Sequence, residues 1–133
     1  MVKTKKICVV GAGQWGKNHI TTLFSLGALG GIVESNKKVL DKYLKLYPNV
    51  KHFASLEDAL LDKTIDGFTI ATPAETHFQI AQRLLQAGKH VLVEKPLALT
   101  VEDAEKLGQL SKKNNTTLMV GHVLLFHPAI IEI

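Results

Sequence analysis

The 133-residue sequence contains a single cysteine, Cys8, and no long apolar run. One cysteine excludes an internal disulfide framework and any zinc site built from several cysteines, and such usage is typical of a reducing cytoplasm. No stretch approaches the roughly 18 apolar residues of a membrane span. The apolar stretch after the basic N-terminus, Ile7 to Val10, is too short for a signal peptide. We therefore expect a cytoplasmic protein without a membrane segment.

Arginine is nearly absent, because all of the 16 basic residues except Arg83 are lysines. The net charge of +4 would suit a nucleic-acid partner. Base recognition relies on bidentate arginine, however, and these lysines are spread along the chain. We expect a solvated basic surface and no nucleic-acid partner. No metal site is predicted either, since His77, His122 and His127 fall in different loops with no acid at ligand spacing.

Short β-branched apolar runs alternate along the chain with segments whose apolar residues recur at helical spacing. The predicted strands cover residues 6–10, 29–33, 50–53, 67–71, 90–94 and 117–121. The predicted helices cover residues 17–26, 39–46, 55–61, 76–87 and 100–114. This alternation predicts an α/β fold, a Rossmann-like doubly wound parallel sheet between two layers of helices.

A glycine-rich turn follows the first predicted strand. Gly11, Gly13 and Gly16 form the pattern G-x-G-x-x-G, with Gln14 and Trp15 inside it. The first glycine permits a tight turn, the second lets a pyrophosphate approach the backbone, and the third lets helix and strand pack closely. Free N–H groups at the helix N-terminus would then bind the phosphates. The motif predicts a dinucleotide-binding site that includes all five residues.

An acidic residue, Glu34, stands where the second predicted strand ends, close to the spacing of about 20 residues expected for the partner of this motif. A carboxylate there accepts hydrogen bonds from the ribose hydroxyls of NAD and repels the 2′-phosphate of NADP. NAD is therefore the expected cofactor, and NADP is disfavoured. The polar residues 35–38 could still partner a phosphate, so NADP stays open, as does an S-adenosylmethionine site, which also uses a glycine-rich turn.

The later strands end in residues suited to chemistry. Ligands of such sheets bind outside the carboxyl ends of the strands, so these ends are expected to converge on one crevice. Lys95 could donate to a substrate hydroxyl and stabilise the developing alkoxide, which makes it the candidate catalytic residue. Glu94 could orient Lys95 or could simply be solvated. The other expected members of the site are Thr72, Pro73 and His77 beside the cofactor and His122 and His127 on the substrate side.

Three segments point to a family: residues 10–17 (VGAGQWGK), 71–77 (ATPAETH) and 87–98 (AGKHVLVEKPLA). Together they resemble the N-terminal domain of the Gfo/Idh/MocA oxidoreductases, and the resemblance covers essentially the whole chain. It implies that the lysine of the E-K-P block, here Lys95, lies beside the nicotinamide and the reacting substrate carbon. Ala74 replaces an asparagine common in this family, which leaves one polar contact unaccounted for.

Three stretches are similar to one branch of that family: residues 15–18, 26–29 and 121–129. The branch acts on UDP-linked N-acetylated sugars. The resemblance implies a 3-dehydrogenase that oxidises the C3 hydroxyl of the sugar with NAD. The expected small-molecule partner is therefore a sugar or nucleotide sugar.

We expect residues 1–121 to form the dinucleotide-binding domain and residues 122–133 to begin a hinge into a second domain. Isoleucines at the end of the chain need something to pack on. The resemblance implies a C-terminal α/β domain that carries the substrate wall, the proton acceptor and a homo-oligomer interface, so this chain alone is expected to be inactive. A non-catalytic nucleotide-binding module is the alternative, and a methyltransferase a weaker one, because it leaves the E-K-P block unexplained.

Overall fold

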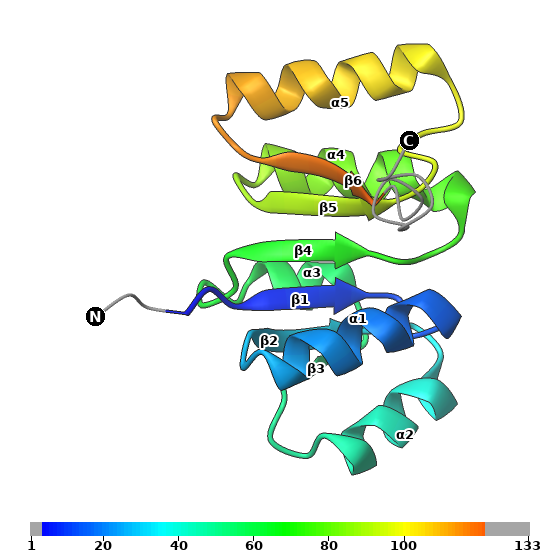
Figure 1. Cartoon of the computed structure of the whole chain (residues 1–133), viewed down its shortest axis with the longest axis vertical. Helices are drawn as coiled ribbons and strands as arrows, with labels where there is room; N and C mark the ends of the chain where they lie inside the picture. The colour runs from blue at the N-terminus through cyan, green and yellow to red at the C-terminus, as the bar shows by residue number, and fades with distance from the viewer. Residues whose placement is uncertain (1–3, 122–133) are drawn as a thin grey trace, which may run out of the picture.

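Residues 4–121 are described by the computed structural model, and they form a six-stranded sheet with helices on both faces (Figure 1). The strands are β1 (Ile7–Val10), β2 (Leu29–Val33), β3 (His52–Phe53), β4 (Gly67–Ile70), β5 (His90–Glu94) and β6 (Leu118–Gly121). The helices are α1 (Gln14–Ser25), α2 (Lys37–Leu46), α3 (Leu56–Leu60), α4 (His77–Gln86) and α5 (Val101–Lys113), and a 3₁₀ turn, η1 (Ala74–Thr76), precedes α4. The strand order is β3-β2-β1-β4-β5-β6, with every neighbouring pair parallel. The predicted Rossmann-like doubly wound fold is confirmed.

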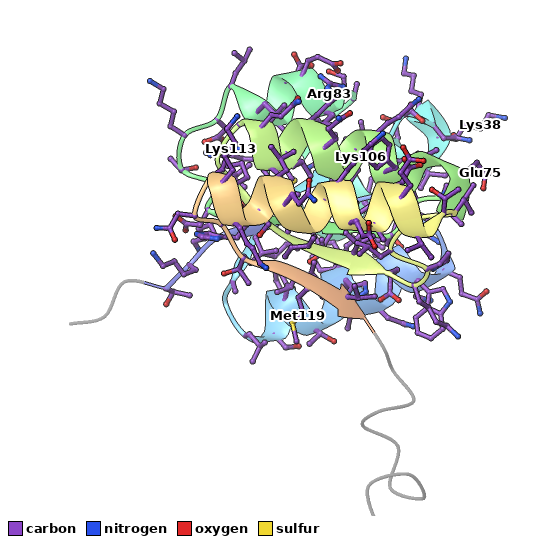
Figure 2. All side chains as sticks on the ribbon, turned by 90° about the horizontal axis from the view of Figure 1, so that it is seen from above. Lys38, Glu75, Arg83, Lys106, Lys113 and Met119 are labelled. Atoms are coloured by element: carbon purple, nitrogen blue, oxygen red, sulfur yellow. The ribbon has the colours of Figure 1, made fainter. Side chains whose placement is uncertain are left out.

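Two apolar cores lie on the two faces of the sheet. The smaller core joins Val9 of β1 to Ile20 of α1 and Tyr43 of α2. The larger core joins the opposite face of the sheet to α3, α4 and α5. In Figure 2, α4, which carries Arg83, and α5, which carries Lys106, lie together over one face. The sheet is thus the middle layer of three, as the sequence predicts.

The side chains of β1 alternate between these cores. Val9 enters the smaller core, whereas Cys8 and Val10 enter the larger one. Cys8 is fully buried, and burial raises the pKa of its thiol. Because the thiolate is the nucleophilic form of cysteine, this residue serves packing rather than chemistry.

Two helices begin earlier than their apolar spacing predicts. α1 begins at Gln14 rather than at Lys17, because Gly13 is its N-cap and its carbonyl oxygen accepts the Lys17 N–H at 2.8 Å. α2 begins at Lys37, because the side-chain oxygen of Asn36 accepts two backbone N–H groups of the first turn. Both starts are set by local hydrogen bonding, which hydrophobic periodicity does not report.

The other elements differ from expectation only in detail. The third strand is shorter than predicted, and the helix predicted over residues 76–87 is divided into η1 and α4. The hydroxyl oxygens of Ser55 and Thr100 cap α3 and α5, since each accepts a backbone N–H three residues on, at 3.3 and 3.1 Å. Gly88 follows α4 with φ of +76°, as expected for a glycine that ends a helix.

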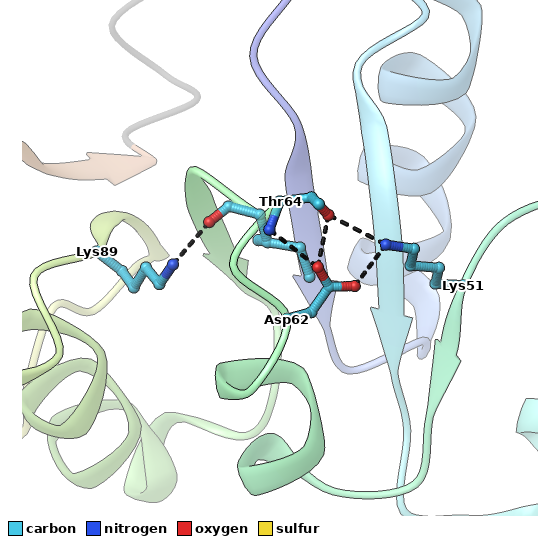
Figure 3. Close-up of polar contacts among 5 residues, drawn as sticks. Lys51, Asp62, Thr64 and Lys89 are labelled. Carbon is cyan, nitrogen blue, oxygen red and sulfur yellow. Dashed lines mark hydrogen bonds and ion pairs between the residues drawn. The ribbon is translucent and has the colours of Figure 1, made fainter.

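A small polar network fixes the turn between α3 and β4 (Figure 3). Asp62 accepts hydrogen bonds from the Lys51 ammonium at 2.6 Å and from the Thr64 N–H and hydroxyl at 2.9 and 2.5 Å. Nearby, the Lys89 ammonium donates to the Ile65 carbonyl oxygen at 2.8 Å. The donors around Asp62, with the Lys51 ammonium foremost, lower the pKa of its carboxyl group to about 2. The network lies at the amino ends of the strands, away from the ends where ligands of such sheets bind.

This carboxylate should make stability depend on pH in the acid range. The pKa of an aspartate is about 3.9 in an unfolded chain, and that of Asp62 in the folded protein is about 2. Its stabilising contribution is therefore present above a pH of about 4 and is lost as the pH falls towards about 2. In urea unfolding, the wild type and Asp62→Asn should differ in stability near neutral pH and converge in acid. A difference that stays constant over this range would contradict the assignment.

Candidate cofactor-binding site

The glycine-rich loop presses α1 against the ends of β1 and β4. A Cβ atom at Gly16 would lie 1.8 Å from the Gly11 carbonyl oxygen, and one at Gly11 would lie 2.9 Å from Cγ2 of Thr72. Gly11 also has a φ of +94°, where any side chain is strained. At Gly13, by contrast, a Cβ atom would meet nothing within 4 Å. The fold itself requires the first and third glycines, whereas the second leaves its backbone open to a ligand.

The N-terminus of α1 offers free backbone donors. No side chain among residues 4–121 caps it, and the N–H groups of a first helical turn have no acceptor within the helix. Gly13, Gln14 and Trp15 are all exposed. Because the helix dipole adds partial positive charge at this end, the loop is suited to bind a pyrophosphate.

Glu34 connects the end of β2 to the same loop. One of its carboxylate oxygens accepts the Ala12 N–H at 2.9 Å, and the other accepts the Asn36 N–H at 2.9 Å. A carboxylate oxygen has room for two hydrogen bonds, so each oxygen retains capacity for a ribose hydroxyl. The two backbone donors hold the negative charge in one place.

A pocket of about 450 Å³ opens between this carboxylate and the end of β4. Glu34 and Ser35 form one side, residues 54–56 a second, and residues 71–73 a third. Much of the remaining lining is apolar, from Val10, Val33 and Ile80. The size is typical of small-molecule sites, and apolar walls with a carboxylate at one end suit an adenosine.

A second pocket, of about 270 Å³, shares Ala71 and Thr72 with the first. Glu94 and Lys95 line it at the end of β5. Its other lining residues are Trp15, Ala74 and His77. The two pockets meet where the strand order reverses between β1 and β4, which is where doubly wound sheets bind dinucleotides. Their arrangement suits the two halves of one dinucleotide, and Glu94 and Lys95 line the half away from Glu34.

His77 ties together the two loops that border the second pocket. It is 1% exposed, and its Nδ1 and Nε2 lie 2.7 and 2.8 Å from the carbonyl oxygens of Pro96 and Thr72. Both ring nitrogens are thus directed at backbone acceptors rather than at the pocket. The Thr72 hydroxyl also contacts the Thr76 hydroxyl, which donates to the Pro73 carbonyl oxygen, both at 2.6 Å. His77 shapes the site through the backbone on either side of it.

Lys95 and Glu94 are adjacent in sequence but differ in surroundings. Lys95 is exposed, and within residues 4–121 no group pairs with its ammonium. Glu94 is only 8% exposed and contacts His19 of α1, with Oε1 2.5 Å from Nε2. Glu94 is thus neither solvated nor paired with Lys95, and the Lys95 ammonium can donate to an oxygen of a bound ligand.

His19 is a member of the site that the sequence motifs did not indicate. Helical spacing could have indicated it, because His19 stands three residues after Gly16 and directly before Ile20, both of which are buried. This spacing places His19 close to the side of α1 that packs on the sheet. A histidine so placed needs a polar partner. The identity of that partner depended on strand order, which local sequence does not reveal.

Two predicted residues, His122 and His127, lie outside the described residues. Within residues 4–121 there is no cluster of three or more metal-ligating side chains. No helix in that part of the chain has the length and apolar character needed to cross a membrane.

Fold and site together define the class of protein. The open helix N-terminus, Glu34 and the two pockets meet at one switch point, so this is a dinucleotide-binding domain. The sequence profile described as "Oxidoreductase family, NAD-binding Rossmann fold" matches residues 5–122. The chain therefore belongs to the Gfo/Idh/MocA family of oxidoreductases, of which it is the NAD-binding domain.

Known relatives agree with this assignment. UDP-N-acetylglucosamine 3-dehydrogenase of Acidithiobacillus ferrooxidans is 32% identical over 127 residues, which are 92% of this chain and 38% of that protein. GenD2 from gentamicin A biosynthesis, solved in complex with NAD, superposes with a TM-score of 0.92 at 30% identity, covering 99% of this chain and 38% of GenD2. WlbA dehydrogenase from Bordetella pertussis, solved with NADH and UDP-GlcNAcA, has a TM-score of 0.83 at 30% identity, covering 89% and 37%. The chain thus spans less than half the length of these relatives, and the predicted family and cofactor are confirmed.

Alanine at two of the loop glycines should separate folding from binding. Gly16→Ala puts a Cβ atom 1.8 Å from the Gly11 carbonyl oxygen, so we expect a loss of at least about 2 kcal/mol in the free energy of unfolding. Gly13→Ala meets no protein atom within 4 Å and should change stability by less than about 1 kcal/mol. It should nevertheless weaken NAD binding by at least about tenfold, because the methyl group obstructs the pyrophosphate. Urea unfolding and calorimetric titration measure the two effects.

Gly108→Ala is the matched control. Gly108 lies within α5, and a Cβ atom there also meets nothing within 4 Å. Alanine should raise stability by roughly 0.5–1 kcal/mol through helix propensity and leave NAD affinity unchanged. If Gly13→Ala bound NAD as tightly as this control, the pyrophosphate would have to lie elsewhere.

Proposed function

We propose that this chain supplies the cofactor half of an NAD-dependent dehydrogenase that oxidises a sugar hydroxyl, the C3 hydroxyl of a UDP-linked N-acetylated sugar. The observation that carries the proposal is the position of Lys95, which lines the second pocket beside Glu94 and whose ammonium has no partner among residues 4–121. A cation there stands at the nicotinamide half of the site, away from the loop that would hold the pyrophosphate. The names of the relatives support the substrate class.

The role of Lys95 follows from its charge. When the substrate hydroxyl gives up its proton, which an acceptor in the second domain would take, negative charge gathers on the hydroxyl oxygen, and the C–H hydride leaves as that oxygen becomes a carbonyl. An ammonium donor beside the oxygen stabilises this alkoxide character in the transition state more than the neutral hydroxyl of the ground state. The bound nicotinamide supplies the hydride acceptor. Glu94 and the Thr72–Pro73 backbone would border that ring, with the backbone held by His77.

The remaining groups divide between cofactor and substrate. Glu34 would accept the ribose hydroxyls, and the N-terminus of α1 would bind the pyrophosphate. We assign His122 and His127 to the substrate side. Residues 122–133 would lead into a second domain that completes the substrate wall and the contacts between subunits.

Glu34 should make the isolated chain prefer NAD to NADP. Its carboxylate is held by the Ala12 and Asn36 N–H groups and would oppose a 2′-phosphate at a cost of a few kcal/mol. Titration with both cofactors should show a higher affinity for NAD than for NADP, and Glu34→Ala should reduce this difference in affinity. Glu102→Ala removes an exposed carboxylate of α5 and should leave the difference in affinity between NAD and NADP unchanged. Equal affinity of the wild type for NAD and NADP would refute the assignment.

Replacing Lys95 tests the catalytic role in the intact enzyme that contains this chain. Lys95→Met keeps the length of the side chain and removes the donor, so kcat should fall by roughly 10²–10³-fold, as on loss of one donor to a developing oxyanion. NAD affinity should change little. Lys106→Met, at an exposed position on α5, is the control. A kcat for Lys95→Met within about threefold of the wild type would exclude Lys95 as the catalytic group and favour a non-catalytic nucleotide-binding module.

A further inference from the structure

The contact between His19 and Glu94 links two elements that are not neighbours in the sheet. His19 lies in α1, which packs on β1 and β2, whereas Glu94 is the last residue of β5, and β4 lies between β1 and β5. Nε2 of His19 and Oε1 of Glu94 lie 2.5 Å apart, within hydrogen-bond distance. The two side chains are 24% and 11% exposed, so water screens the contact only in part.

The carboxylate of Glu94 has a fixed place in the second pocket. Val93 enters the larger core, and since successive side chains of a strand point to opposite faces, Glu94 is directed towards the α1 face. Gly121 is its register partner on β6, and a Cβ atom there would lie 3.2 Å from each carboxylate oxygen. Glu94 is thus confined between His19 and the backbone of Gly121 while it lines the pocket.

We propose that His19 is a positioning residue that holds the Glu94 carboxylate as a fixed negative charge towards the nicotinamide, so that the site favours the oxidised, positively charged cofactor over the reduced one. The inference rests on the proposed function, because it takes the second pocket as the nicotinamide half. A charge held in a partly shielded pocket acts more strongly than one in open water. Lys95, the other charged residue lining that pocket, is exposed, so water screens its ammonium more than it screens the buried Glu94 carboxylate.

Comparing three ligands isolates the effect on the nicotinamide. NAD⁺, NADH and ADP-ribose are titrated into the chain, and ADP-ribose lacks the nicotinamide while keeping the rest. Glu94→Gln keeps the shape of the side chain and removes its charge. We expect the preference for NAD⁺ over NADH, measured as the ratio of the two Kd values, to fall by about tenfold. The Kd for ADP-ribose should stay within about twofold of the wild type.

Variants at His19 test the positioning role. His19→Phe removes the hydrogen bond to Glu94 and so releases its carboxylate. The preference for NAD⁺ over NADH should then fall by about threefold, less than in Glu94→Gln. His19→Gln, whose amide nitrogen can take the place of Nε2, should restore the wild-type ratio. Glu102→Gln, which removes an exposed carboxylate on α5, should leave the affinities for all three ligands unchanged. A purely structural role for His19 would instead change the affinity for all three ligands together.

The outcomes separate this inference from the proposed function. Failure of the wild type to bind NAD⁺ and ADP-ribose would refute the proposed function. Binding of all three ligands with an unchanged ratio in Glu94→Gln would overturn the inference alone, and a ratio unmoved by His19→Phe would overturn the part assigned to His19. Should Glu94→Gln fail to fold, Gly121→Ala crowds the same carboxylate without removing it, and an unchanged ratio there would also overturn the inference.

Discussion

The close approach of α1 to the turn after β1 is the constraint on which the rest of the site depends. Gly16 stands so near the Gly11 carbonyl oxygen that no larger residue fits, and the same turn lies against Thr72 at the end of β4. The N-terminus of α1 is thereby locked at the switch point of the sheet. Ala12, inside this loop, donates its N–H to Glu34, so the position of the Glu34 carboxylate in the first pocket depends on the same contact.

That anchoring also determines the walls of the second pocket. Once α1 is fixed at its first turn, Trp15 falls on the wall of the second pocket and His19 falls within reach of Glu94. One helix therefore takes part in both halves of the site. His77 performs the corresponding task from α4, since its two ring nitrogens bridge the loops after β4 and β5. The pocket walls are set by helices that pack on opposite faces of the sheet.

These contacts mark the limit of what the sequence could predict. The alternation of strands and helices, the glycine-rich loop, the caps at Ser55 and Thr100 and the carboxylate of Glu34 were predictable, because each depends on residues close together in the chain or on a known pairing of motifs. The partner of His19 is 75 residues away and lies across an intervening strand, so it depends on register and helix placement. The early start of α1 was missed for a different reason, since a glycine N-cap leaves no polar residue to detect.

The pairing of Glu94 also explains how Lys95 is available for chemistry. At the amino ends of the strands, Lys51 pairs with Asp62 and Lys89 with a carbonyl oxygen, so those cations stabilise turns. At the carboxyl ends, an acid and a lysine are adjacent in the chain, and if they paired with each other the ammonium would already be neutralised. His19 takes the carboxylate instead. The ammonium of Lys95 is left without a partner among residues 4–121. Such an unpaired charge is expected at a site where a bound ligand supplies the acceptor.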